Sequence, residues 1–137
     1  MSQENVEIVR RGYEFFAATG EVRAEGTAPD FVWDMSNFRG WPEQQTYEGR
    51  EGARMFLRDW LEAWDGWQLE VEEYRELDAE RVLVIGHHSG RGKTSGVEVG
   101  QMQTKVAAVF HIHDGKVTRL VTYWERDRAF ADLGLKE

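Results

Sequence analysis

The central and C-terminal part of this chain reads as a series of β-strands, and this feature limits the possible folds more than any other. Between residues 67 and 123 the sequence is rich in β-branched and aromatic residues, and turn-forming residues divide it. The pattern predicts strands over residues 67–74, 81–90, 97–113 and 116–123. Short turns between long strands favour an antiparallel sheet.

Two local signals shape this predicted sheet. The alternation of apolar and polar residues along 67–74 slips at Glu72 and Glu73. A slip of this kind indicates a β-bulge, which bends a strand. Asp114 and Gly115 form a dipeptide typical of a tight hairpin turn. We therefore expect a bent first strand and a hairpin at the end of the series.

Two amphipathic helices are predicted before these strands. The first has apolar residues at steps of 3, 4 and 3 between Val6 and Phe16, and Gly20 can end it. The second ends before Asp65 and Gly66 and has the clearer apolar face. Its apolar residues are Ala53, Phe56, Leu57, Trp60, Leu61 and Trp64.

The remaining segments have weaker signals. Residues 21–28 are weakly helical, residues 31–35 resemble a short strand, and residues 36–49 resemble a loop. A last short helix carries Phe130 and ends at Gly134. Helices, one strand, a helix and then a meander of strands together predict the α+β class.

Composition restricts the functional classes. The length predicts one domain over residues 1–137. With 17 basic and 25 acidic residues the net charge is -8, which disfavours nucleic acid as a partner. The absence of cysteine excludes disulfides and cysteine-bound metals. Neither a signal peptide nor a membrane-spanning segment is recognisable, so a cytoplasmic location without membrane partners is predicted.

Two apparent motifs do not carry the chemistry they suggest. Residues 92–94 resemble the end of a phosphate-binding loop, but that loop needs a glycine where His87 stands and a helix afterwards. His111 and His113 share one strand face and can in principle bind a metal. They are expected on the outer face without a third ligand, so neither a metal nor another cofactor is predicted.

Four stretches form an ordered pattern that is found in a known superfamily. With these stretches the sequence resembles the SnoaL-like branch of the nuclear transport factor 2-like superfamily. The resemblance covers nearly the whole chain. The stretches are VRRGYEFF at residues 9–16, PDFVW at 29–33, YEGREG at 47–52 and DGKV at 114–117, with Tyr123 beyond the last.

This resemblance implies a fold, an assembly and a range of functions. The implied fold is a cone, in which a strongly curved antiparallel or mixed sheet wraps around three helices of the N-terminal half and leaves a central pocket. It also implies a homodimer, usually formed through the outer sheet face. Relatives include polyketide cyclases, ketosteroid isomerases, limonene-epoxide hydrolases, dehydratases and proteins with a binding role alone. The fold does not select among these functions.

The catalytic groups of ketosteroid isomerases are only partly present. Those enzymes use an Asp base and an oxyanion hole formed by a Tyr and a protonated Asp. By resemblance, Tyr13 falls near the Tyr position. Met35 falls at the base position with Asp34 beside it, and Ala108 falls at the second Asp position. Isomerase chemistry of this type is therefore disfavoured.

Other residues are candidates for an active site in the implied pocket. His88 lies next to His87 on a predicted strand, so one of the two is expected to point inward. A histidine that only hydrogen-bonds in the core or at the sheet surface is the favoured interpretation, and His88 is the candidate general base if the site is catalytic. Tyr13 is the candidate hydrogen-bond donor. An apolar small molecule is the expected partner. The predicted ligand-binding walls are Trp33, Met35, Trp41, Tyr47, Phe56, Trp60, Met102, Thr104, Ala108 and Trp124.

Three hypotheses remain open from the sequence. The first is a cofactor-independent isomerase, cyclase, hydrolase or dehydratase that acts on an apolar ring-containing substrate. The second is a binding protein without chemistry, because the Asp pair is missing and the predicted lining is otherwise apolar. The third is an accessory dimer whose pocket is filled by the bulky tryptophans.

Overall fold

The computed structural model describes residues 2–19, 21, 23–35, 46–92, 105–123 and 125–134. Of residues 2, 3, 24, 63–68 and 88–92 it describes only the backbone. The elements in chain order are α1 (Ser2–Thr19), the short 3-10 helix η1 (Ala24–Gly26), β1 (Thr27–Asp34), β2 (Thr46–Glu48), α2 (Gly49–Ala63), β3 (Trp64–Glu76), β4 (Arg81–Gly92), β5 (Lys105–His113), β6 (Lys116–Tyr123) and α3 (Arg126–Leu133).

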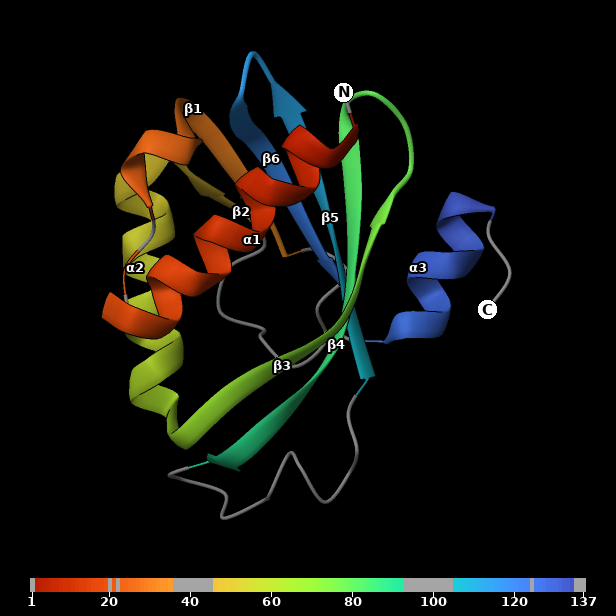
Figure 1. Ribbon diagram of the computed structural model, residues 1–137. Helices are drawn as coiled ribbons and strands as arrows, with labels where there is room; N and C mark the ends of the chain where they lie inside the picture. The colour runs from red at the N-terminus through yellow and green to blue at the C-terminus, as the bar shows by residue number, and fades with distance from the viewer. Residues whose placement is uncertain are drawn as a thin grey trace.

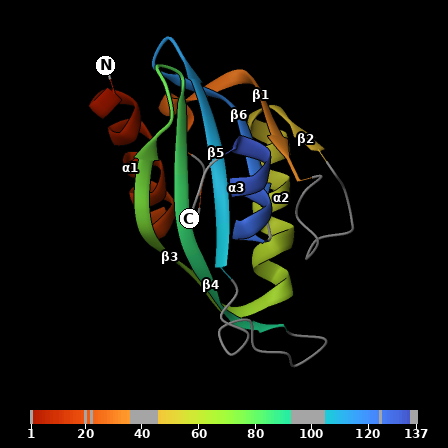
Figure 2. The same ribbon diagram turned by 90° about the vertical axis from the view of Figure 1, so that its right-hand side faces the viewer.

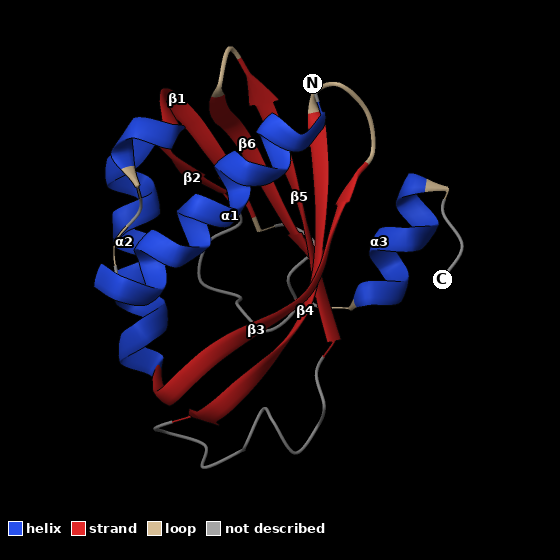
Figure 3. Ribbon diagram, in the orientation of Figure 1, coloured by secondary structure: helices blue, strands red, loops and turns tan. Residues whose placement is uncertain are grey.

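The six described strands form one mixed sheet that is not closed. Their order is β2-β1-β6-β5-β4-β3. Within it β1 and β6 run parallel, and the other neighbouring pairs are antiparallel. The sheet curls around α1 and α2, while α3 lies on its opposite side (Figures 1 and 3). This is the cone-shaped α+β fold that the resemblance implies, with α1, η1 and α2 all in the N-terminal half.

The concave face of the sheet holds the main core. Val9 of α1 and Ala53 of α2 are almost fully buried against Val82, Ile112 and Leu120 of the sheet. These helical residues lie on the apolar faces that the sequence predicts, because a 3.6-residue period places them on one side of each helix. Both helices therefore pack inside the curve of the sheet. No helix in the described part of the chain is long and apolar enough to cross a membrane.

The local signals for the bulge and the hairpin are confirmed. The register between β3 and β4 shifts between Val71 and Glu73, where the alternation slips in the sequence. Asp114 and Gly115 have φ angles of 50° and 77°, and they join β5 to β6. Positive φ at both central residues is the conformation of a type I′ turn, which Asp-Gly favours.

The structure differs from the predictions between residues 21 and 49. The weak helix over residues 21–28 is wrong in extent, because among the described residues of this range η1 alone is helical and Thr27 already begins β1. The predicted loop contains the short strand β2, which pairs with β1. Helix α2 begins at Gly49, where the Arg50 guanidinium donates to the Thr27 carbonyl oxygen at 2.7 and 3.1 Å. Contacts between distant segments decide these boundaries, so local patterns do not show them. Residues 97–104 of the predicted long strand lie outside the described residues.

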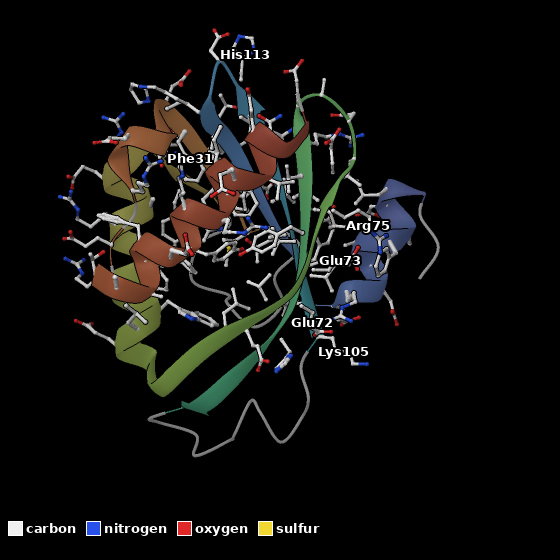
Figure 4. All side chains as sticks on the ribbon, in the orientation of Figure 1. Phe31, Glu72, Glu73, Arg75, Lys105 and His113 are labelled. Atoms are coloured by element: carbon white, nitrogen blue, oxygen red, sulfur yellow. The ribbon has the colours of Figure 1, made fainter. Side chains whose placement is uncertain are left out.

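Helix α3 covers part of the outer sheet face. Ala129 and Phe130 pack on Leu83, Ile85 and Val109, which point away from the concave side. Figure 2 looks onto this face. Figure 4 shows Glu72, Glu73 and Arg75 of β3 on the same side as α3, and Phe31 on the side of α1 and α2. The outer face is therefore partly apolar and partly charged.

A charged contact attaches the beginning of α3 to the sheet. The Arg126 guanidinium donates to Glu72 at 2.8 Å and to the Gly86 carbonyl oxygen at 3.0 Å. Glu72 also lies 3.1 Å from Nδ1 of His87. Hydrogen bonds from His87 and then Arg126 hold the pKa of Glu72 below its usual 4.5. The ionised carboxylate is therefore the form that the folded state favours.

We expect the substitution Glu72→Gln to be most destabilising at neutral pH. Because the pKa of Glu72 is lower in the folded than in the unfolded state, its stabilising effect is present above pH 4.5 and declines as the pH falls through the folded-state pKa. Urea unfolding of the wild type and of the Glu72→Gln variant, each at pH 7 and at pH 3, measures this loss of stability. The difference in unfolding free energy should shrink at pH 3, and a difference that does not depend on pH contradicts the assignment.

Candidate functional site

A cavity of about 870 Å³ lies between the concave face of the sheet and helices α1 and α2. This volume is in the range of small-molecule sites. Most of the lining side chains are apolar. The described lining residues are Ile8, Val9, Gly12, Tyr13, Glu14, Phe16, Ala17, Arg23, Gly26, Thr27, Phe31, Trp33, Met35, Phe56, Leu57, Trp60, Leu61, Leu69, Glu70, Val71, Val84, Gly86, Val106, Ala107, Ala108, Phe110, Val117, Leu120 and Thr122.

One wall of the cavity consists of packed aromatic rings from β1 and α2. The centroids of Trp33 and Phe56 lie 4.5 Å apart, and those of Phe56 and Trp60 lie 5.9 Å apart. Phe31 extends this row, since its ring centre is 6.2 Å from that of Trp33. Contacts at these distances fix the rings against each other. They therefore give the wall a defined shape, with flat apolar surfaces that suit a ring-containing ligand.

Tyr13 places a hydroxyl group at the opposite wall. Its ring packs edge-on against Phe110 and Tyr74, at centroid distances of 5.7 and 6.3 Å. Burial, and secondarily the nearby Tyr74, raise the pKa of the Tyr13 hydroxyl above its usual value of 10.0. The group therefore stays protonated at neutral pH. Within the described part of the chain this hydroxyl has no hydrogen-bond partner, so its proton is available to a ligand.

A second polar pair lies in the wall between β1 and β6. Nε1 of Trp33 donates to Oγ1 of Thr122 at 2.9 Å, and both residues line the cavity. The parallel pairing of the two strands places Trp33 opposite Leu120, two residues before Thr122. The bond satisfies the indole N–H, which is costly to bury without a partner. Thr122 is not a predicted site residue, although its alternation with Leu120 could have indicated an inward position.

Three charged residues belong to the described lining. Glu14 is exposed, and Arg23 pairs with Glu25 at 3.3 Å. The Glu70 carboxylate lies 3.2 Å from Nε2 of His87 and is also largely exposed. The charges therefore lie where water reaches them, and the interior of the cavity is bounded by apolar side chains, hydroxyls and the indole of Trp33.

The predicted site residues differ in where the structure places them. Tyr47 is buried beside Phe56, with ring centres 5.2 Å apart, but it is not in the cavity lining, which is a correction to its predicted role. Steric contact explains this, because Gly52 of α2 packs closely against Tyr47. The predicted residues that line the cavity are Tyr13, Trp33, Met35, Phe56, Trp60 and Ala108.

The side chains of the other predicted site residues lie outside the described part of the structure. The backbone of β4 sets His88 opposite Leu69, and its side chain lies outside the described residues, so its role as a base stays a prediction. Four predicted wall residues also lie outside the described part of the chain. They are Trp41, Met102, Thr104 and Trp124.

Asp34 and His111 are titratable residues that do not belong to the cavity lining. Asp34 pairs with Arg119 at 2.7 Å and does not line the cavity. His111 lies on the outer face, where burial and then the cations of Arg81 and Arg119 lower its pKa. Among the described residues, no group of three or more metal-binding side chains is close enough to hold an ion.

The SnoaL-like domain model matches residues 9–120 of this chain. The matched segment contains the C-terminal part of α1, the whole aromatic wall and most of the sheet. The chain therefore belongs to the SnoaL-like domain family. None of the curated proteins matches it.

Solved structures share the fold over nearly the whole chain. One is TerC co-crystallised with polyporic acid, with 24% identity, a TM-score of 0.71, and coverage of 95% of this chain and 97% of TerC. A nuclear transport factor 2-like protein from Burkholderia xenovorans LB400 has 29% identity, a TM-score of 0.66 and 90% coverage of both chains. A protein from Catenulispora acidiphila with a ketosteroid isomerase-like fold, crystallised with trimethylamine, has 13% identity and a TM-score of 0.62, with 82% and 79% coverage.

Proposed function

We propose that this protein binds an apolar, ring-containing small molecule in the central cavity. The observation that carries the proposal is a cavity of about 870 Å³ with a wall of aromatic rings and a Tyr13 hydroxyl that has no partner among the described residues. Burial of the ligand's apolar surface supplies the favourable free energy, at roughly 25 cal/mol per Å². Two proteins of the same fold were crystallised with small molecules, which supports a binding role for this cavity.

Tyr13 gives the ligand an orientation. Its protonated hydroxyl donates a hydrogen bond in a mostly apolar environment, where an unsatisfied polar group is costly. A ligand with a carbonyl or other acceptor oxygen at this position satisfies the donor. A hydrocarbon of the same shape leaves the hydroxyl without a partner. We therefore propose that the bound ring carries at least one acceptor oxygen.

Acid–base chemistry is the second candidate function, and the Tyr13 hydroxyl is the observation that favours it. A donor that stays protonated can stabilise negative charge that develops on a substrate oxygen. We propose His88 as the base in that case. The reaction would be a cofactor-independent isomerisation, cyclisation, hydrolysis or dehydration. The homodimer expected from the resemblance also stays a prediction.

A thermal-shift series with polyketide-like, steroid-like and terpenoid compounds tests the binding role. A compound that binds only the folded state at a hundred times its dissociation constant stabilises it by about 2.7 kcal/mol, which raises the melting temperature by several degrees. We expect the substitution Ala108→Leu to remove this shift, because Ala108 lines the cavity and a larger side chain reduces its volume. The substitution Ala79→Leu is the matched control, since Ala79 is exposed in the turn between β3 and β4.

Two outcomes decide between the candidate functions. Failure of every compound to stabilise the wild type, or an equal shift in the Ala108→Leu protein, contradicts binding in this cavity. For a compound that binds, chromatography of the mixture after incubation shows whether it is converted. Conversion that is lost in His88→Ala, with binding retained, supports acid–base catalysis. An unchanged ligand supports a binding protein without chemistry.

A further inference from the structure

Thr122 has hydrogen-bonding capacity that no described residue of the protein uses. Its hydroxyl accepts the Nε1–H of Trp33 at 2.9 Å, which occupies one lone pair of the oxygen. No described residue accepts the hydroxyl proton of Thr122 in return. The side chain is partly buried and lines the cavity, so the proton is available there rather than in bulk solvent.

Trp33 restricts the orientation of this hydroxyl. A threonine hydroxyl normally rotates to suit its partners. Here the indole N–H holds the oxygen from one side, and the Trp33 ring is itself held by Phe56 at 4.5 Å and by Phe31 at 6.2 Å. A group fixed in advance loses less entropy when a ligand binds, so a preorganised donor contributes more to affinity than a mobile one.

Among the described lining residues, Tyr13 and Thr122 carry hydroxyl groups without a described acceptor, and they come from different elements. Thr122 lies on β6 beside β1, while Tyr13 packs on Phe110 of β5 and Tyr74 of β3. Tyr13 belongs to helix α1 and Thr122 to the sheet, where Phe110 lies opposite Leu120, so the two side chains come from different layers of the fold. A ligand oxygen that accepts a hydrogen bond from Tyr13 alone leaves the Thr122 proton for a second acceptor oxygen of the ligand.

We propose that Thr122, oriented by Trp33, is a specificity-determining residue that donates a hydrogen bond to the ligand, and that the ligand is a ring compound with acceptor oxygens at two separate positions. The inference rests on the proposed binding function and narrows its ligand class. Ring diketones and quinones have this arrangement of oxygens. A ring with a single polar group leaves one of the two donors without a partner, which costs affinity.

Calorimetric titration with 1,4-naphthoquinone and with naphthalene tests this role. The two probes have the same ring skeleton and differ in two carbonyl oxygens. The chain has no cysteine, so the quinone cannot react with a thiol. We expect the substitution Thr122→Val to weaken the binding of naphthoquinone by about 2- to 12-fold, the range for one neutral hydrogen bond, and to leave naphthalene unchanged. Thr122→Ser keeps the hydroxyl and should bind both probes as the wild type does.

A matched control and a second variant separate binding from folding. Thr118 lies on the same strand, donates to the His111 carbonyl oxygen at 3.3 Å and does not line the cavity, so Thr118→Val should leave both affinities unchanged. Thr122→Val leaves the Trp33 N–H without its partner. If that protein does not fold, the double substitution Trp33→Phe and Thr122→Val removes both partners and is compared with Trp33→Phe alone.

The outcomes distinguish this inference from the function on which it rests. Equal naphthoquinone affinity of the wild type and Thr122→Val overturns the role of Thr122 and leaves the binding role intact. An equal loss for naphthalene also overturns it, because that loss reports a change in cavity shape. Absence of binding of either probe to the wild type contradicts the binding role and this inference together.

Discussion

The substitution Trp60→Ala is expected to lower the free energy of unfolding by about 3–5 kcal/mol, the usual cost of removing a large aromatic side chain from a core. Trp60 is 2% exposed, and it packs with Met35, Phe56 and Leu57 where α2 meets the sheet. Loss of the indole removes this buried contact area and leaves a void that the neighbouring side chains fill only in part. Because the total stability of a domain is about 5–15 kcal/mol, this loss is a large fraction of it.

Urea unfolding followed by circular dichroism measures the effect of Trp60→Ala. Met55→Ala is the matched control on the same helix, because Met55 is 46% exposed and its removal should change the stability by less than about 0.5 kcal/mol. Similar unfolding free energies for the two variants contradict the assignment of Trp60 to the core. Since Trp60 also lines the cavity, we further expect Trp60→Ala to weaken ligand binding where the protein still folds.

The substitution Gly86→Ala is expected to destabilise the protein by about 1–3 kcal/mol, the usual range for overpacking. The Cβ atom that alanine adds at position 86 would lie 2.5 Å from the Glu70 carbonyl oxygen and 3.3 Å from Cδ1 of Leu69. The first of these contacts is with backbone, so rotation of a side chain cannot relieve it. The strands β3 and β4 must separate, next to the bulge between Val71 and Glu73.

Gly12→Ala is the control for Gly86→Ala, and we expect it to have the opposite sign. Gly12 also lines the cavity, but a Cβ atom there meets nothing within 4 Å. In the interior of α1 the exchange of glycine for alanine should stabilise the helix by up to about 1 kcal/mol. Thermal unfolding of both variants measures the contrast. Destabilisation by both, or by neither, contradicts the steric explanation.

Much of the fold is predictable because it depends on local patterns. The helical faces of Val9 and Ala53, the slip at Glu72 and the Asp114–Gly115 turn each involve residues that are near neighbours in the chain. A helix or a hairpin turn forms through bonds over a few residues, so its signal is contained in a short window of sequence. The resemblance to the SnoaL-like proteins then predicted how these parts are arranged.

Local sequence patterns predicted the candidate site less well than the fold. The hydrogen bond from Trp33 to Thr122 joins residues 89 positions apart, and it depends on the parallel pairing of β1 with β6. Tyr47 was predicted at the cavity wall and lies opposite Trp33 across β1 and β2, but its packing on Gly52 and Phe56 of α2 keeps it out of the lining. A one-residue change in register moves a strand side chain to the other face of the sheet, so the local sequence pattern does not show whether Thr122 or Tyr47 faces the cavity.

The sequence by itself therefore determined the α+β class, the order of the main elements, the turns and the apolar faces, because local hydrogen bonding and side-chain periodicity define them. Only the tertiary structure decided that the hydroxyl groups of Tyr13 and Thr122, which have no acceptor among the described residues, belong to the lining of one cavity, and that Tyr47 does not. Strand register and the packing of distant segments set these positions, and both depend on contacts that form only when the whole chain has folded.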